Sequence, residues 1–240
     1  MSKQTPKLVL LPGMDGTGKL FKHLVSALPG SVESVVVAYP NEDCQSYPDL
    51  SNLVWSTVPR DDPFVLVAES FSTPLAIQCA AANPPGLKGL VLCAGFASRP
   101  IPAPLANIVS RLLSPLFLRT PPDFLIKLLL LGPDTPPSLV KETRDVIASV
   151  PRKVLRNRLR TLLACDVRSD MGHIRVPILY LQATNDRLIS RTCAEEIRRC
   201  NPATEVTAIA GPHLLLQREP VQAARRIETF LKQICGSQEQ

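Results

Sequence analysis

Residues 64–76 read Phe64-Val-Leu-Val-Ala-Glu-Ser-Phe-Ser-Thr-Pro-Leu-Ala76, an apolar run that ends in a short polar stretch and continues with helix-like spacing. The run is continuously hydrophobic, as expected of a strand that helices cover on both faces. A sharp turn from such a strand into a helix holds its central residue clear of the backbone if the flanking residues are small. Ala68 and Ser72 replace the usual glycines and are small. Ser70 is therefore a candidate nucleophile, with helix capping as the alternative role.

The same alternation of apolar runs and helix-like stretches extends to both sides of this segment. We expect further strands at 7–13, 35–39, 89–93, 178–181 and 205–209, and helices at 20–28, 50–58, 71–82, 193–200 and 221–234. Strands alternating with helices indicate parallel pairing through right-handed crossovers. The sequence therefore predicts an α/β fold with a mostly parallel sheet of about six strands and helices on both faces.

The alternation stops between Gly95 and Ile178, a gap too long for a loop without structure of its own. Prolines in this gap separate helical stretches, which we place at 105–113, 123–131, 138–148 and 152–165. We therefore expect a helical cap, residues 99–172, inserted into a core domain formed by residues 1–98 and 173–240.

A serine nucleophile needs a base, and the chain has three histidines. His213 follows the last predicted strand in Gly211-Pro-His-Leu214, at the carboxyl edge of the sheet, where ligands of parallel sheets collect. His23 lies within the first predicted helix, so we expect a surface or helix-face role for it, and His173 lies before a strand, so we expect a structural role. We predict that His213 is the base.

The base in turn needs a carboxylate to orient it. Asp186 follows the penultimate predicted strand, in Ala183-Thr-Asn-Asp-Arg187. Asp166 and Asp170 are weaker alternatives because they fall within the predicted cap. We predict that Asp186 is the acid.

The first predicted strand ends in Pro12-Gly-Met-Asp-Gly-Thr-Gly-Lys19, which allows two interpretations. Gly13 to Lys19 satisfies most of the phosphate-binding P-loop pattern, but Leu20 replaces the Ser or Thr that would hold magnesium. In the alternative, Gly13 lets the backbone turn so that the Met14 and Phe71 N–H groups face a developing oxyanion. We favour the second interpretation.

These segments, in this chain order, resemble the α/β-hydrolase superfamily in its branch of small capped carboxylesterases. The likeness covers residues 7–234 apart from the cap, and extends to the pimeloyl-acyl-carrier-protein methyl ester esterase type. It implies a Ser70, Asp186 and His213 triad in the order typical of this fold. It also implies an oxyanion hole of main-chain N–H groups, and esterase activity without a cofactor or metal.

Composition places the chain among ordinary globular proteins. Hydrophobic residues make up 45% and charged residues 20% of 240, which argues against disorder. The seven cysteines form no Cys-x-x-Cys pair, so neither a disulfide scaffold nor a zinc site is indicated. No apolar run is long enough to span a bilayer or to form a secretory signal. We expect a cytoplasmic protein without stable membrane insertion.

Substrate preference must come from the predicted cap. Its apolar side chains could line an acyl pocket or simply form core; we name Leu113, Phe117, Phe124 and Leu128 as substrate-binding candidates, together with Leu214 beside the predicted base. We expect a carboxylesterase for small to medium acyl chains. A thioesterase or acyl-carrier-protein ester hydrolase would use the same residues, and a non-catalytic ligand-binding module is a further alternative.

Residues 99–172 contain 12 of the 27 basic residues and 6 of the 21 acidic ones, which accounts for the whole net charge of +6. Basic residues gather at Arg152, Lys153, Arg156, Arg158 and Arg160. They could steer an acidic acyl carrier protein toward the site, or they could form a solvated helix face. No aromatic residues are interleaved with them, and Trp55 lies elsewhere, so we expect no nucleic-acid partner.

Overall fold

The structure is a computed structural model that describes residues 5–41, 46–58, 62–101 and 121–236. Its described residues form one six-stranded sheet in which every neighbouring pair is parallel, with strand order β2-β1-β3-β4-β5-β6. The predicted α/β class is confirmed, and each predicted strand overlaps an observed one, although the strand predicted at 35–39 ends at Val36. The strands are β1 (Lys7–Leu11), β2 (Ser34–Val36), β3 (Phe64–Glu69), β4 (Leu87–Cys93), β5 (Ile178–Ala183) and β6 (Glu205–Ile209).

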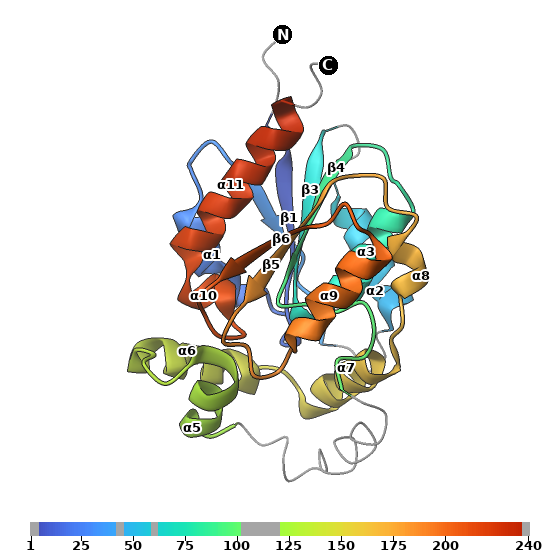
Figure 1. Cartoon of the computed structure of the whole chain (residues 1–240). Coiled ribbons are helices and arrows are strands. Elements are labelled where there is room, and N and C mark those ends of the chain that lie inside the picture. The colour runs from blue at the N-terminus through green and yellow to red at the C-terminus, as the bar shows by residue number, and fades with distance from the viewer. Residues whose placement is uncertain (1–4, 42–45, 59–61, 102–120, 237–240) are drawn as a thin grey trace.

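Helices cover both faces of the sheet, and successive strand residues alternate between the two cores (Figure 1). Val9 and Leu66 join the core beneath α2, α3 and α9, while Leu10 and Val67 join the core beneath α1, α10 and α11. This two-sided burial explains the unbroken apolar runs. The helices are η1 (Lys19–Phe21), α1 (Lys22–Ala27), α2 (Tyr47–Thr57), η2 (Ser70–Ser72), α3 (Thr73–Ala81), α8 (Arg168–Met171), α9 (Arg191–Cys200), α10 (Leu215–Arg218) and α11 (Pro220–Gly236).

A further group of helices lies beyond the carboxyl ends of the strands: α5 (Asp123–Ile126), η3 (Lys127–Leu131), α6 (Pro137–Ala148) and α7 (Arg152–Ala164) (Figure 1). The expected single helix at 123–131 is one α-helical turn followed by a π-helix, η3. Residues of α5, η3 and α6 form a separate small core with Leu20 and Leu214. The predicted helix at 105–113 lies outside the described residues.

The start of β1 and the end of α11 lie at the opposite edge of the sheet from these helices (Figure 1). Within the part of the chain that the structure describes, no helix has the length and apolar character needed to cross a bilayer.

Candidate active site

Ser70 occupies the turn between β3 and α3 with a strained backbone. Its φ is +49°, in the left-handed region that side chains other than glycine rarely adopt. The turn passes directly from the last residue of β3 into η2 and then α3. Ala68 and Ser72 on either side are fully buried, which leaves no space for larger residues. The Ser70 side chain is thereby held away from the sheet, as the sequence pattern predicted.

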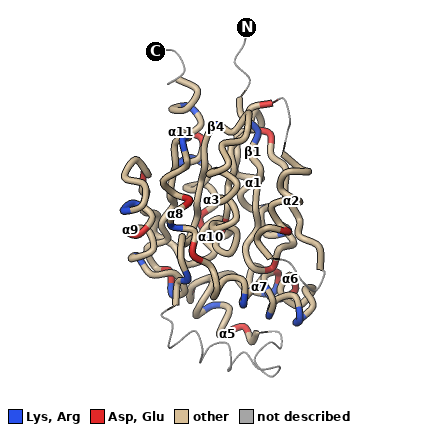
Figure 2. Tube along the Cα trace, turned by 90° about the vertical axis from the view of Figure 1, so that its right-hand side faces the viewer, with Lys and Arg blue, Asp and Glu red and all other residues tan. Residues whose placement is uncertain are grey.

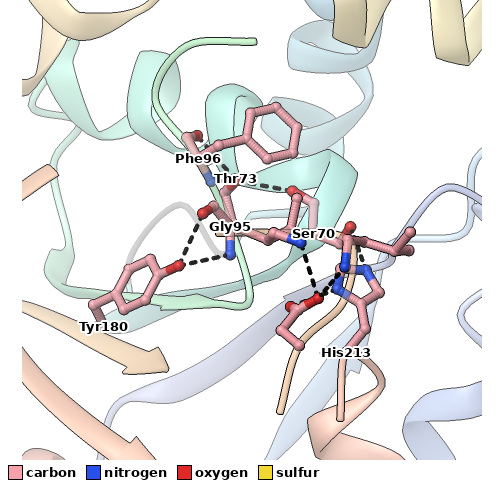
Figure 3. Close-up of polar contacts among 9 residues, drawn as sticks. Ser70, Thr73, Gly95, Phe96, Tyr180 and His213 are labelled. Atoms are coloured by element: carbon pink, nitrogen blue, oxygen red, sulfur yellow. Dashed lines mark hydrogen bonds and ion pairs between the residues drawn. The ribbon is translucent and has the colours of Figure 1, made fainter. Parts of the chain in front are cut away.

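A polar cluster behind the turn supports this conformation (Figure 3). Thr73 Oγ1 donates to the Ser70 carbonyl at 2.8 Å and accepts from Phe96 N–H at 3.0 Å. The Tyr180 hydroxyl donates to the Gly95 carbonyl at 2.8 Å. A Cβ atom at Gly95 would lie 2.2 Å from Thr73 Cγ2, so only glycine allows this close approach. Sequence reasoning did not assign these supporting residues.

Ser70, His213 and Asp186 form a continuous chain of hydrogen bonds. His213 Nε2 lies 3.0 Å from Ser70 Oγ (Figure 3). On the other side of the ring, His213 Nδ1 lies 2.8 Å from Asp186 Oδ2. The His213 and Asp186 side chains are only 5% and 3% exposed. The other carboxylate oxygen, Asp186 Oδ1, accepts from Leu188 N–H at 2.8 Å and Ile189 N–H at 2.9 Å. The carboxylate is therefore fixed from both sides.

The loops that carry the acid and the histidine are joined to each other and to the neighbouring helices. Asn185 N–H donates to the Gly211 carbonyl at 2.9 Å, which links the two loops. Leu214 N–H donates to the Leu130 carbonyl of η3, also at 2.9 Å. The residue after His213 is thus held by a π-helix, a rare element that frequently occurs at functional sites.

The loop after β1 is a tight turn next to Ser70 rather than a phosphate cradle. Gly16 N–H donates to the Gly13 carbonyl at 3.0 Å, so Met14 and Asp15 are the central residues of the turn. Met14 N–H has no hydrogen-bond acceptor among the described residues. This free donor belongs to the pair, Met14 and Phe71, that the sequence analysis proposed for the oxyanion hole.

An apolar cavity of about 420 Å³ adjoins Ser70 and His213. Ser70 and His213 lie on its wall with Gly13, Met14 and Asp15, and the remaining lining is mostly aliphatic. Such a volume is sufficient for a small-molecule ligand. The aliphatic side chains come chiefly from α6, α7 and the loops after β5 and β6: Ile147, Val150, Leu155, Leu159, Leu162, Leu188, Ile189 and Leu214.

The predicted substrate-binding residues fall in different places. Leu214 lines the cavity. Phe124 and Leu128 are 66% and 45% exposed and lie outside the lining. Leu113 and Phe117 lie outside the described residues. Helical spacing could not show which side of α5 and η3 faces the cavity, and the aliphatic residues of α7 provide much of the lining instead.

Glu69, directly before Ser70, is a buried carboxyl group without an assigned role. Its Oε2 accepts from Gln217 Nε2 at 3.3 Å, while Oε1 has no partner among the described residues. Burial raises the pKa of Glu69 to about 7, although the nearby His213 and the Gln217 hydrogen bond act in the opposite direction. A Glu69 carboxyl group is therefore partly protonated near neutral pH.

The alternative candidates lie away from the cavity. His23 Nε2 contacts Glu142 Oε2 at 3.2 Å, and the His173 carbonyl accepts from Asn83. Asp166 forms an ion pair with Arg168, which lowers the pKa of the carboxyl group. None of these residues, nor Asp170, belongs to the described cavity lining.

Comparison with known proteins agrees with this geometry. The family model described as "Alpha/beta hydrolase family" matches residues 8–226. The chain belongs to that family. This α/β hydrolase is also 26% identical, over 232 residues, to the biotin biosynthesis bifunctional protein BioHC of Cellvibrio japonicus. The match covers 93% of this chain but 45% of that protein, so the hydrolase spans less than half of its relative's length.

Solved structures share the fold of this hydrolase at low sequence identity. A carboxylesterase from Nitrososphaera gargenis superposes with a TM-score of 0.81 at 12% identity, covering 98% of this chain and 93% of that one. A lipase-esterase related protein from Clostridium acetobutylicum has a TM-score of 0.79 at 15% identity, covering 95% of both chains. These similarities establish the architecture of the hydrolase.

Proposed function

We propose that this α/β hydrolase is a serine carboxylesterase that cleaves esters of small to medium acyl chains through an acyl-enzyme intermediate. The observation that carries the proposal is the hydrogen-bonded chain from Ser70 through His213 to Asp186, whose Ser70 and His213 lie on the wall of an apolar cavity. In this proposal residues 99–172 form a cap on a core of residues 1–98 and 173–240. The helices α5, η3, α6 and α7, which lie beyond the strand ends, support a cap in this range (Figure 1). The last helix of the range, α8, packs instead on the core, where Met171 is buried with residues of α3 and α9.

The proposed reaction follows from the roles that this geometry allows. Ser70 Oγ attacks the ester carbonyl while its proton passes to His213 Nε2. Asp186 holds the imidazole in the tautomer that carries a proton on Nδ1, and stabilises the imidazolium. Main-chain N–H groups of Met14 and Phe71 receive the oxyanion. His213 then returns the proton to the leaving alcohol, and an activated water hydrolyses the acyl-enzyme to release the acid and restore Ser70.

The test is Ser70→Ala measured against a p-nitrophenyl ester and a fluorophosphonate probe. The wild-type protein should hydrolyse the ester and be labelled by the probe. Ser70→Ala should lose labelling, and its turnover should fall by at least about 10³-fold, because no other group supplies the nucleophile. Ser169→Ala removes an exposed hydroxyl from α8 and should behave like the wild type. Turnover that survives in Ser70→Ala removes Ser70 from the mechanism, while binding without labelling or turnover indicates a non-catalytic module.

A thioesterase would use the same residues, so the leaving group is a separate question. Matched ester and thioester substrates of one acyl chain distinguish the two activities by their kcat/KM ratio. The similarity to a biotin biosynthesis protein supports the methyl ester of pimeloyl-acyl carrier protein as the first carrier-bound substrate to try. A cytoplasmic location stays a prediction from sequence.

A further inference from the structure

Arg158 belongs to the basic stretch of α7, yet it is only 1% exposed. Its guanidinium group donates to main-chain carbonyls of the loops that follow β1 and β2. Nη1 donates to the carbonyl of Met14 at 3.1 Å and to that of Asp15 at 2.6 Å, and Nη2 donates to the carbonyl of Pro40 at 3.1 Å. The side chain thus connects α7 to the turn that carries the proposed oxyanion donor.

The contacts of Arg158 continue to the nucleophile turn through Tyr39. The guanidinium carbon lies 5.6 Å from the centroid of the Tyr39 ring, a distance at which a cation and an aromatic ring attract each other. The Tyr39 hydroxyl is 2.5 Å from Ser72 Oγ, which in turn donates to the Pro12 carbonyl. Ser72, two positions after Ser70, and Pro12, two positions before Met14, therefore belong to the same network of contacts as Arg158.

Gly16 leaves space for the guanidinium group of Arg158. Its φ is +69°, and a Cβ atom at this position would lie 2.3 Å from Arg158 Nη1. The turn therefore needs glycine for its conformation and for the space that Arg158 occupies.

The burial of this cation has a free-energy penalty that its contacts must offset. Burial lowers the pKa of Arg158, while the nearby Asp15 and Tyr39 act in the opposite direction. A buried charge requires hydrogen-bond partners, and here the partners include the carbonyls of Met14 and Asp15, which belong to the two peptide groups that follow the Met14 N–H group. The geometry of the turn and the position of the guanidinium group consequently depend on each other.

We propose that Arg158 is a positioning residue for the oxyanion hole. It fixes the peptide groups of Met14 and Asp15 so that Met14 N–H faces the oxyanion formed at Ser70, and it thereby couples the rate of acyl transfer to the position of α7. The inference rests on the proposed esterase function. A purely structural Arg158 would instead affect folding and ligand binding without a selective effect on the transition state.

The experiment compares Arg158→Met with the wild type, with Arg158→Lys and with Arg226→Met, which removes an exposed charge from α11. The readouts are kcat on a p-nitrophenyl ester, the Ki of a trifluoromethyl ketone, and the Kd of an alkyl ether of the same chain length. The ketone forms a tetrahedral oxyanion on serine, whereas the ether has no carbonyl group. Circular dichroism reports whether each variant folds.

We expect Arg158→Met to lower kcat by about 10- to 100-fold and to weaken ketone binding by a similar factor, because a misplaced donor stabilises the transition state less. Ether binding should change less than about twofold, as a transition-state effect requires. Arg158→Lys should recover part of the loss, and Arg226→Met should match the wild type. An unchanged kcat, or equal losses of ketone and ether binding, would overturn the proposal.

Gly16→Ala tests the same contact from the other side, and keeps the proposal testable if Arg158→Met does not fold. The added methyl group should displace the guanidinium group and give the same selective loss of kcat and ketone affinity. In the double variant the losses should not add, because both substitutions disturb one contact. Additive losses, or a Gly16→Ala variant with wild-type kcat, would contradict the proposed role.

The rate of fluorophosphonate labelling of Ser70 separates this inference from the proposed function. Labelling also requires an oxyanion hole but needs no ester substrate. A wild-type protein that is labelled but hydrolyses no ester fails the esterase proposal. The ratio of labelling rates between Arg158→Met and the wild type still tests Arg158: a fall of about tenfold or more supports it, and an unchanged rate overturns it.

Discussion

At the level of single residues, the buried Glu69 carboxyl group predicts a pH-dependent stability. Its pKa rises from an ordinary 4.5 to about 7 in the folded protein because of burial. Between these values the folded state retains a proton that the unfolded state has lost, so the unfolding free energy falls as pH rises. We expect the unfolding free energy of Glu69→Gln to lack this pH-dependent contribution, which amounts to about 1–3 kcal/mol. Urea unfolding of both proteins at pH 5, 6, 7 and 8 measures the difference.

The matched control for this prediction is Glu195→Gln, an exposed carboxylate on α9. Its stability should follow the wild-type pH dependence. Stability curves of wild type and Glu69→Gln that stay parallel from pH 5 to pH 8 would show that Glu69 does not titrate in this range.

Residue type, together with position after a predicted strand, was enough to predict the reacting residues of the site but not the residues that hold them in place. Ser70, Asp186 and His213 were predicted because each follows a recognisable strand, and parallel strands bring their carboxyl ends to one edge. Arg158 was grouped with exposed charges because an arginine on a polar helix is usually solvated. Its carbonyl partners lie more than 100 positions away in the chain, and no local pattern contains that contact. Gly16 was the available signal, since a glycine in a turn can mark a close approach.

At the level of elements, the junction between α3 and the loop after β4 depends on Gly95. Replacement by alanine would place a methyl group 2.2 Å from Thr73 Cγ2, so Thr73 would have to move away from the Ser70 carbonyl. We expect Gly95→Ala to destabilise the protein by about 1–3 kcal/mol and to slow fluorophosphonate labelling of Ser70. Gly30→Ala, where no atom lies within 4 Å of the added methyl group, should change neither quantity. Thermal unfolding and labelling rates test both variants.

The strands were predictable because burial on both faces gives unbroken apolar runs, and the longer helices because their apolar residues recur at helical spacing. The helices α8 and α10 were missed because each has four residues, fewer than two turns of helical periodicity. The π-helix η3 was predicted only as part of one helical stretch at 123–131, since Lys127-Leu-Leu-Leu-Leu131 contains no signal for an i→i+5 hydrogen bond.

At the level of the whole molecule, the charge distribution predicts how a carrier-bound substrate would behave. Arg152, Lys153 and Arg160 are exposed on α7, and Arg152 also lines the cavity; Figure 2 shows basic residues around α6 and α7. If they steer an acidic carrier protein, kcat/KM for a carrier-bound ester should fall steeply as salt increases, while a neutral ester is unaffected. Arg160→Gln should weaken the salt dependence and Arg226→Gln should not. Parallel salt curves for the two substrates would reject steering.

The start of β1 and the end of α11 both lie at the end of the sheet opposite α6 and α7 (Figure 1), and these two helices supply part of the cavity lining. A tag, a surface tether or another polypeptide fused near either of these positions would project from the rear of the molecule. Immobilised or fused forms should therefore leave the cavity unobstructed, and loss of activity on such attachment would need an explanation other than blockage.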